Sequence, residues 1–255
     1  MDFPSRHQLR EYLEGGIVVW LAQVSVSMPE LPAMERYLLG NEPEQAARYR
    51  FPEDRARYIL GRALVRKGLA HFLSSRALSF DFAYTDRGRP VLMRNENISF
   101  SISHTGDFVA VALTANARVG VDIERTESKK DLMALSEKIL STKDRRIFST
   151  LPVWDIMPTF FRIWTRKEAY LKARGEGITD GLQKFSVSFS ADEITTVIDE
   201  RDRGNEAKWR LHNLNIATGY AGSVACDDAR KRIELQRIRF LGPEAIIDPL
   251  ATGTQ

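Results

Sequence analysis

Two acidic residues in a short apolar segment are the first candidates for chemistry. In Val119–Glu124, Asp122 and Glu124 alternate with Val121 and Ile123. Because the side chains of a strand alternate between its faces, the two carboxylates share one face while the aliphatic side chains pack on the other. Two carboxylates at this spacing repel each other unless a cation lies between them, and Mg²⁺ binds carboxylate oxygens. The alternative is a solvent-facing strand that carries two acids.

A third carboxylate lies in a segment with helical periodicity. Thr159–Arg174 is predicted to form a helix in which Glu168 and Lys172, four residues apart, share one face. Glu168 is a candidate third metal ligand and Lys172 a candidate donor to a phosphate, while an ordinary surface ion pair between them is the alternative. Lys167 lies nearer the buried stripe of the helix, so we expect a structural role for it. Gly175 is predicted to end the helix as a left-handed cap.

Ser103 and His104 follow a third patterned segment. In Ile98–Ser103, large apolar residues alternate with serines, which predicts a strand with its serines facing outward. His104 continues the inward parity, so it is either a core histidine or, at the strand end, a hydrogen-bond donor to a phosphate oxygen. A serine hydrolase is disfavoured because no G-x-S-x-G surrounds Ser103. The chain also lacks a P-loop and a G-x-G-x-x-G turn.

Composition narrows the possible classes. The 255 residues contain one cysteine, Cys226, which excludes an intramolecular disulfide and a cysteine-rich zinc site. The four histidines have no paired spacing, so a metal site must consist mostly of carboxylates. The net charge is +3, and Arg48–Lys67 has seven basic residues against two acids. That stretch suits phosphates or an acidic partner, and a solvated helix face is the alternative.

The order of elements predicts an α+β protein of two similar lobes, residues 1–117 and 118–255. Both halves share the order of helix first and strands afterwards. No secretory signal or membrane-spanning segment is predicted, and we expect a cytoplasmic protein. The predicted helices are Glu44–Phe72 with a break at Pro52, Leu132–Phe148 and Thr159–Arg174. The predicted strands are Ile17–Ser27, Phe80–Tyr84, Ile98–Ser103, Phe108–Thr114, Val119–Glu124, Phe185–Phe189, Trp209–Leu214, Tyr220–Ala225 and Ile233–Arg239.

Taken together, these segments resemble the 4′-phosphopantetheinyl transferases of the two-lobed, surfactin-synthetase-activating type. The resemblance covers roughly residues 45–190, and more loosely the C-terminal strands. Each short motif is unspecific, but their order and separations are specific in combination. The five motifs are Gly61–Arg66, Gly88–Pro90, Ile98–Gly106, Gly120–Glu124 and Trp164–Lys172.

The resemblance implies a fold of two α+β lobes with pseudo-twofold symmetry and an active site at their junction. It implies a Mg²⁺-dependent enzyme that transfers the 4′-phosphopantetheine arm of coenzyme A to a serine of an acyl, peptidyl or aryl carrier protein and releases 3′,5′-ADP. Since both lobes come from one chain, a monomer is expected. The implied roles are metal binding by Asp122, Glu124 and Glu168, catalysis by Glu168 and Lys172, and coenzyme binding by Arg57, Arg89, Ser103, His104 and Lys172.

The chain departs from the family pattern at three positions. Glu42 and Gln45 stand where members often have lysines ahead of the basic helix. Arg89 replaces a lysine, which keeps the charge and adds a forked donor.

Three other functions are considered. A metal-dependent hydrolase of coenzyme A or nucleotides would use the same carboxylates without a carrier protein. A nucleic-acid-binding protein would use Arg48–Lys67, but few aromatic residues are interleaved there and the net charge is small. Partners that are nucleic acid or membrane are therefore not expected. A degenerate coenzyme A-binding module is disfavoured because nearly every candidate position is filled.

Overall fold

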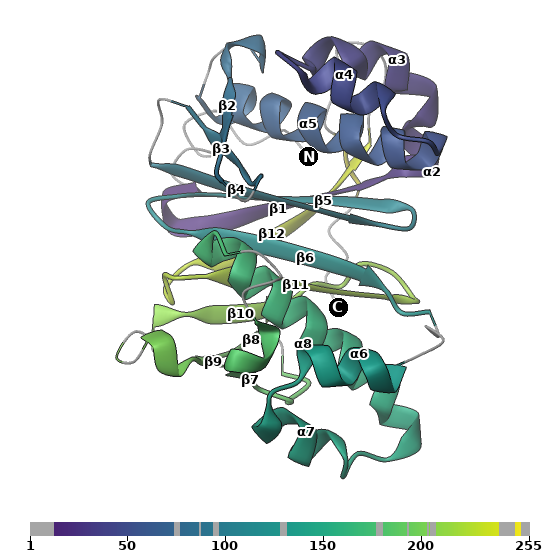
Figure 1. The fold of residues 1–255 in the computed structure, drawn as a ribbon. Coiled ribbons are helices and arrows are strands. Elements are labelled where there is room, and N and C mark those ends of the chain that lie inside the picture. The colour runs from purple at the N-terminus through teal and green to yellow at the C-terminus, as the bar shows by residue number, and fades with distance from the viewer. Residues whose placement is uncertain are drawn as a thin grey trace. The chain divides into compact units, whose positions relative to one another are not determined.

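The chain forms two compact units, which consist of residues 1–116 with 232–255 and of residues 117–231 (Figure 1). The computed structural model describes residues 13–73, 77–86, 88–93, 97–127, 132–176, 181–192, 194–202, 204, 208–239 and 248–250. The first unit is called the N-terminal unit and the second the C-terminal unit. Helices and strands occur in both, in agreement with the α+β class.

The last strands of the chain belong to the N-terminal unit, which corrects the predicted lobe of residues 118–255. Strand β12 (Arg232–Arg239) pairs in parallel with β1 (Gly16–Gln23), with Gly16 opposite Arg232. A parallel pairing between segments more than 200 residues apart leaves no local signal in the sequence. The break near residue 117 does separate the two units.

The sheet of the N-terminal unit has the order β13-β12-β1-β5-β4. Strands β4 (Ile98–Thr105) and β5 (Phe108–Ala115) form a hairpin, and β5 also pairs with β1. Helix α5 (Pro52–Leu73) lies along one face of this sheet (Figure 1). The smaller elements are α2 (Val24–Ser27), α3 (Leu31–Met34), α4 (Glu42–Ala47), β2 (Phe82–Tyr84), β3 (Pro90–Leu92) and β13 (Asp248–Leu250).

The sheet of the C-terminal unit has the order β6-β11-β10-β8, and helix α8 (Val153–Arg174) packs on it. Helix α8 ends at Gly175, whose φ of 74° is left-handed, as predicted. The unit also contains β6 (Val119–Arg125), α6 (Leu132–Ile139), α7 (Thr142–Phe148), β7 (Ser186–Val187), β8 (Ile194–Thr195), β9 (Val197–Ile198), β10 (Arg210–Asn213) and β11 (Tyr220–Cys226).

Two predicted elements are each divided in the structure. Leu132–Phe148 forms α6 and α7 rather than one helix, because Ser141 begins α7 with a capping box that it shares with Asp144. Ile17–Ser27 is a strand only as far as Gln23, after which the chain turns into α2. The predicted break at Pro52 is confirmed, since α5 begins there.

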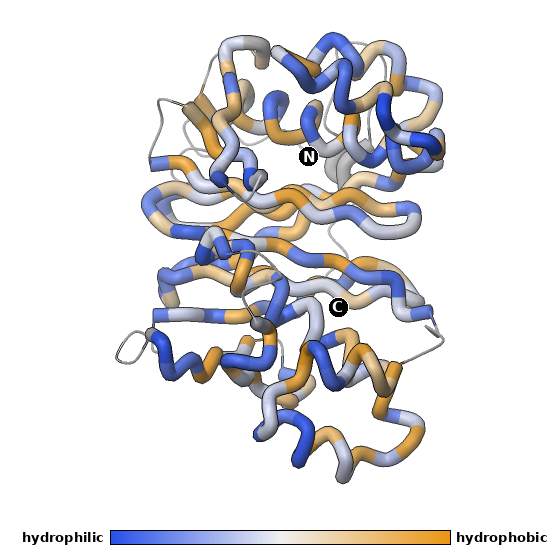
Figure 2. The backbone as a smooth tube through the Cα atoms, in the orientation of Figure 1, coloured by the Kyte–Doolittle hydropathy of each residue, from blue (hydrophilic) through white to orange (hydrophobic). Residues whose placement is uncertain are grey.

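Each unit has its own hydrophobic core. The N-terminal core joins β1, β5 and α5, and the C-terminal core joins α8 to the strands beneath it. Figure 2 shows hydrophobic residues along the central strands of the first sheet, and all eight residues of β5 are buried. Strand β4, which pairs with β5, has Ser101 and Ser103 only 6% exposed, whereas His104 is exposed. The predicted outward serines are therefore wrong, since two of them are buried. His104 is not a core histidine, and its exposure at the strand end agrees with the second alternative.

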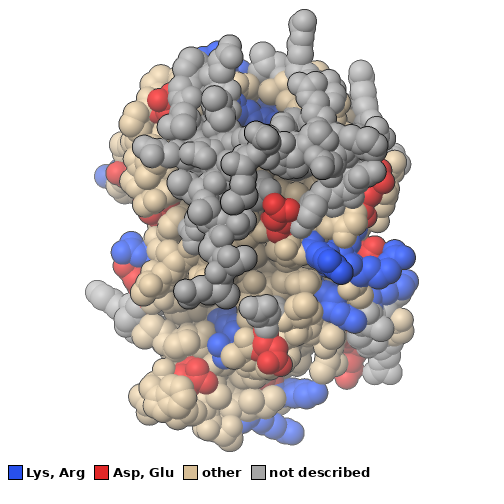
Figure 3. All heavy atoms as spheres, turned by 180° about the vertical axis from the view of Figure 1, so that it is seen from behind, with Lys and Arg blue, Asp and Glu red and all other residues tan. Residues whose placement is uncertain are grey.

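The basic stretch Arg48–Lys67 is only partly a surface feature. Arg62 and Arg66 are buried and form ion pairs with Glu42, so they add nothing to a surface charge. On the face seen in Figure 3, Lys and Arg side chains gather toward one edge with acidic side chains nearby.

None of the helices among the described residues is both long and apolar enough to cross a membrane. The cytoplasmic location stays a prediction.

Candidate active site

Gly120 brings β6 and α8 into backbone contact in the C-terminal unit. A Cβ atom at Gly120 would lie 2.0 Å from the carbonyl oxygen of Ala169 and 2.4 Å from the amide nitrogen of Ala173. No side chain fits there, so only glycine allows this approach. The contact sets the acids of β6 against the second half of α8, where Glu168 and Lys172 lie.

Asp122 and Glu124 lie close enough to Glu168 to affect its carboxyl group, in agreement with the candidate third metal ligand. Burial raises the pKa of Glu168 to about 7, and the negative charges of Asp122 and Glu124 contribute to the rise. The ammonium of Lys172 and a hydrogen bond from the Trp164 side chain act in the opposite direction. Asp122 and Glu168 are only 5% and 4% exposed. The site therefore concentrates negative charge in a poorly hydrated place.

The ammonium group of Lys172 compensates part of that negative charge. Its Nζ donates a hydrogen bond to Asp122 Oδ1 at 2.7 Å, and its side chain remains 29% exposed. The ordinary surface pair between Glu168 and Lys172 does not describe this geometry, because Glu168 is buried and the ion pair goes to Asp122. An exposed ammonium beside buried carboxylates can also contact a phosphate.

The donor set of this cluster suits a hard cation. In the part of the chain that the structure describes, no three His, Cys, Asp or Glu side chains are already arranged to hold a metal ion. Carboxylates are nevertheless the ligands that Mg²⁺ prefers, and a cation would relieve the repulsion of Glu168 by Asp122 and Glu124. The residues present therefore fit Mg²⁺ in their chemistry.

Lys167 and Asp144 support this region from inside the core. Lys167 is fully buried and pairs with Asp144 at 2.6 Å, in keeping with the structural role expected for it. Its ammonium also donates to the carbonyl oxygens of Ile139, Leu182 and Phe185. Asp144 was missed by the sequence reasoning, although Ser141 three residues before it is a capping-box signal. The side chain of Trp164, the first residue of the last of the five motifs, donates a hydrogen bond to Glu168, a contact that the sequence did not predict.

The other four predicted site residues lie in the N-terminal unit, around β4. Ser103 is buried near the end of the strand and His104 is exposed beside it. Arg57 reaches the turn after His104, where its Nη1 donates to the carbonyl oxygen of Gly106 at 2.5 Å. Arg89 donates from Nη2 to the carbonyl oxygen of Phe100 at 3.3 Å.

Glu42 and Gln45, which stand in place of the expected lysines, have structural partners. Glu42 is 2% exposed and accepts hydrogen bonds from Arg66 at 2.7 Å and from Tyr84 at 3.2 Å. Gln45 accepts a hydrogen bond from Tyr58 at 2.9 Å. Both residues thus hold α4 to its neighbours within the N-terminal unit, and Glu42 offers no positive charge to a phosphate.

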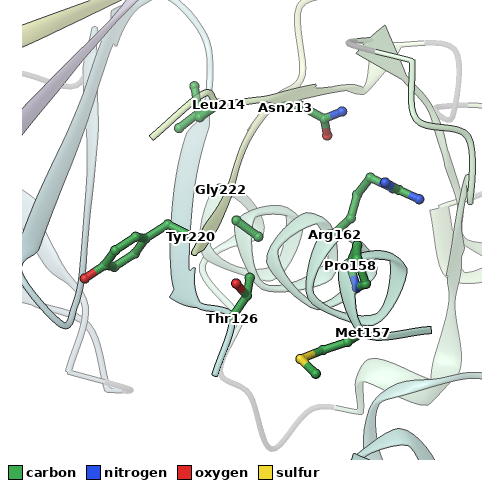
Figure 4. A pocket seen from close by; sticks show the side chains of 9 residues that line it. Thr126, Met157, Pro158, Arg162, Asn213, Leu214, Tyr220 and Gly222 are labelled. Carbon is green, nitrogen blue, oxygen red and sulfur yellow. The ribbon is translucent and has the colours of Figure 1, made fainter. Parts of the chain in front are cut away.

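A cavity of about 320 Å³ opens beside the first half of α8 (Figure 4). Thr126, which directly follows β6, contributes to its wall and continues the alternation of Asp122 and Glu124. Thr126 is two residues after Glu124 in the sequence, and none of the four residues of the charged cluster lines the cavity. Its lining combines apolar and polar side chains: Thr126, Met157, Pro158, Arg162, Asn213, Leu214, Tyr220, Ala221 and Gly222.

Two family models match the sequence. The model described as the 4′-phosphopantetheinyl transferase superfamily matches residues 118–225. The model described as the N-terminal part of 4′-phosphopantetheinyl transferase matches residues 25–116.

Several curated proteins are similar over most of their length. The 4′-phosphopantetheinyl transferase psf-1 of Bacillus pumilus is 32% identical over 205 residues, which are 80% of this chain and 84% of that protein. The 4′-phosphopantetheinyl transferase HetI of Nostoc is 30% identical over 180 residues, or 69% and 76% of the two chains. A crystal structure of a holo-(acyl-carrier-protein) synthase from Bacillus anthracis also matches. Its sequence is 21% identical, and the match covers 39% of this chain and 93% of that chain with a TM-score of 0.33.

Proposed function

Because the chain belongs to the 4′-phosphopantetheinyl transferase superfamily, we propose that it transfers the 4′-phosphopantetheine arm of coenzyme A to a serine of an acyl, peptidyl or aryl carrier protein. The observation that carries the proposal is the cluster of Asp122, Glu124, Glu168 and Lys172, which offers a base and a cation at one place. The same cluster serves a phosphoryl transfer in which charge must be neutralised and a proton removed.

Glu168 accepts the proton of the carrier serine. The serine oxygen bonds to the phosphorus that carries pantetheine, the bond from that phosphorus to the other phosphate breaks, and 3′,5′-ADP leaves. The serine proton passes to the Glu168 carboxylate directly or through one water. Burial and the charges of Asp122 and Glu124 raise the pKa of Glu168, which makes its carboxylate a stronger proton acceptor than an ordinary glutamate.

Lys172 offsets the negative charge of the phosphates. Its exposed ammonium lies beside Asp122, so it can contact a phosphate oxygen without moving the helix. Asp122, Glu124 and Glu168 would hold Mg²⁺. When bound, the ion polarises the phosphate and stabilises the charge on the leaving group.

The predicted residues of the N-terminal unit bind the nucleotide end of coenzyme A. His104 is exposed at the end of β4 and can donate to the pyrophosphate, with Ser103 beside it. Arg57 and Arg89 carry the positive charge that the 3′-phosphate requires. Since both units come from one chain, a monomer suffices.

The cavity beside Thr126 accommodates the pantetheine arm. The arm is neutral and carries amide and hydroxyl groups, which match a lining of apolar side chains with Thr126, Asn213 and Tyr220. Thr126 of its wall follows Glu124 by two residues in the sequence, and the cavity lies against α8, the helix that also carries Glu168.

The proposal is tested by incubating the protein with coenzyme A, Mg²⁺ and several apo carrier proteins. Mass spectrometry should show the gain of one phosphopantetheine on at least one carrier, and release of 3′,5′-ADP should require that carrier. Release without a carrier would show a hydrolase instead, and an unmodified set of acyl, peptidyl and aryl carriers would refute the transfer.

A further inference from the structure

The turn that follows His104 is anchored by the residue at its end, Asp107. The Asp107 carboxylate accepts hydrogen bonds from the backbone N–H and the hydroxyl of Ser25 and from the side-chain amide of Gln23, each at 2.7 Å. Its backbone carbonyl accepts from Val24 N–H at 2.8 Å. Four hydrogen bonds thus tie this one residue to the end of β1 and the start of α2.

Asp107 does for α2 what an N-cap residue normally does. The N-cap of α2, Gln23, makes no capping hydrogen bond with its own side chain, so the first N–H groups of the helix need another acceptor. Asp107 supplies it from a different part of the chain. Burial alone would raise the pKa of Asp107, but the hydrogen bonds from Ser25 and Gln23 and the charge of Arg57 together lower it. The carboxylate is therefore ionised while it makes these bonds.

The opposite side of the same turn is held by α5. Arg57 donates from Nη1 to the carbonyl oxygen of Gly106 at 2.5 Å and pairs through Nη2 with Asp54. Gly106 itself has a φ of 52°, in the left-handed region that favours glycine. The turn is thus fixed between α5 and α2, and His104 lies two residues before Gly106, opposite Val109 in the β4–β5 ladder.

We propose that Asp107 is a positioning residue, which holds the β4–β5 turn so that His104 meets the pyrophosphate of coenzyme A. The proposal rests on the role given to His104 under the proposed function. Without the Asp107 carboxylate the turn loses three hydrogen bonds to Gln23 and Ser25, while the Arg57 contact, the backbone bond to Val24 and the β4–β5 pairing remain. A half-buried turn with fewer anchors samples more conformations. The affinity for coenzyme A should therefore fall, because part of the binding free energy is used to order a misplaced His104.

The test measures steady-state transfer for three variants of the full chain. Asp107→Ala should raise the KM for coenzyme A about 3- to 10-fold with a smaller change in kcat, as expected for losing hydrogen bonds to a charged group. Ser25→Ala, which removes one donor, should have a smaller effect of the same kind. Asp107→Asn keeps one acceptor oxygen and should restore part of the affinity. Asp81→Ala, which removes an exposed acid of the same unit, is the matched control and should leave the KM unchanged.

A double-mutant cycle with His104→Ala separates positioning from a general loss of structure. If Asp107 acts through His104, the Asp107→Ala effect on KM disappears in the His104→Ala background. An effect of the same size in both backgrounds overturns the positioning role while leaving the proposed function intact. If His104→Ala alone leaves the KM unchanged, the role of His104 fails and the role of Asp107 fails with it. Unfolding curves of each variant show whether enough folded protein is present for the comparison.

Discussion

The carboxylate of Glu168 is the group on which the proposed chemistry depends most. It is 4% exposed, lies near two other carboxylates and has a pKa raised to about 7. A buried acid with this environment costs folding free energy when ionised, and such costs are typical of groups that move protons. The neighbours that counter the rise, Lys172 and Trp164, keep the carboxylate partly available as a base.

Glu168→Gln should lower kcat for transfer by about 100-fold or more, because the amide cannot accept the serine proton. The free energy of unfolding should be unchanged or higher, since a neutral side chain removes the repulsion from Asp122 and Glu124. Single-turnover kinetics with an apo carrier and urea unfolding measure the two quantities. Full transfer by this variant would remove Glu168 from the role of base.

His212 should make the stability of the C-terminal unit depend on pH. Burial, helped by the charge of Arg210, lowers the pKa of His212 to about 4, and its buried Nε2 has no hydrogen-bond partner among the residues that the structure describes. The fold therefore favours the neutral ring. Its contribution is complete above the ordinary pKa of about 6.5 and is lost as the pH falls toward 4, up to roughly 3 kcal/mol.

The measurement is urea unfolding at several pH values between 7 and 4.5 for the wild type and for His212→Leu. The variant cannot titrate at this position, so its free energy of unfolding should fall less over the same range. Equal losses in both proteins would show that other groups cause the acid sensitivity.

At the level of elements, the contact between β6 and α8 determines the position of the proposed metal ligands. Asp122 and Glu124 come from the strand and Glu168 from the helix, so their separation depends on how closely the two backbones approach. Gly120 permits that approach because it has no Cβ.

Gly120→Ala should destabilise the protein by about 3 kcal/mol or more and abolish transfer. The new methyl group would meet backbone atoms of α8, which cannot rotate away as a side chain can. Gly15→Ala is the control, because no atom of the described part of the chain lies within 4 Å of a Cβ there. Thermal unfolding and activity are compared for both variants, and a stable, active Gly120→Ala protein would contradict the tight contact.

Local patterns predicted some elements and site residues better than others, for physical reasons. The alternation in β6 correctly predicted that Asp122 and Glu124 share one face, since the charges of both affect the pKa of Glu168. The same parity failed at His104, because this residue lies next to the end of β4 and is exposed although it continues the inward-facing positions. The helix break at Pro52 could be predicted from the sequence, because proline begins α5 there. The division of Leu132–Phe148 into two helices could have been predicted only from the capping box of Ser141 and Asp144.

At the level of the whole molecule, the N-terminal unit is built from both ends of the described chain. Gly16 of β1 lies opposite Arg232 of β12, while Ile17 lies opposite Thr114 of β5. The chain thus leaves the sheet after β5, at residue 116, and returns to it with β12, at residue 232. Strands β5 and β12 lie on opposite sides of β1. Residues 117–231 are in effect an insertion into the N-terminal unit.

Leu235→Pro should loosen the N-terminal unit and spare the C-terminal one. Proline cannot donate to the strand ladder, and Leu235 lies in the middle of β12 opposite Val19, so the expected loss is about 3 kcal/mol. Hydrogen exchange should rise in β1 but not in β6. Leu235→Val, which keeps the backbone donor, is the control, and equal exchange in the two variants would argue against a stabilising role for β12.

The insertion also dictates the order in which the molecule can assemble during translation. Residues 117–231 leave the ribosome as a continuous segment and can fold as soon as Lys231 has emerged. Strand β1 is synthesised about 200 residues before β12, so it lacks one neighbour until residues 232–239 have been made. Over that interval an apolar strand edge is open to other nascent chains, which makes the β12 side of β1 the place where a chaperone would have most to protect.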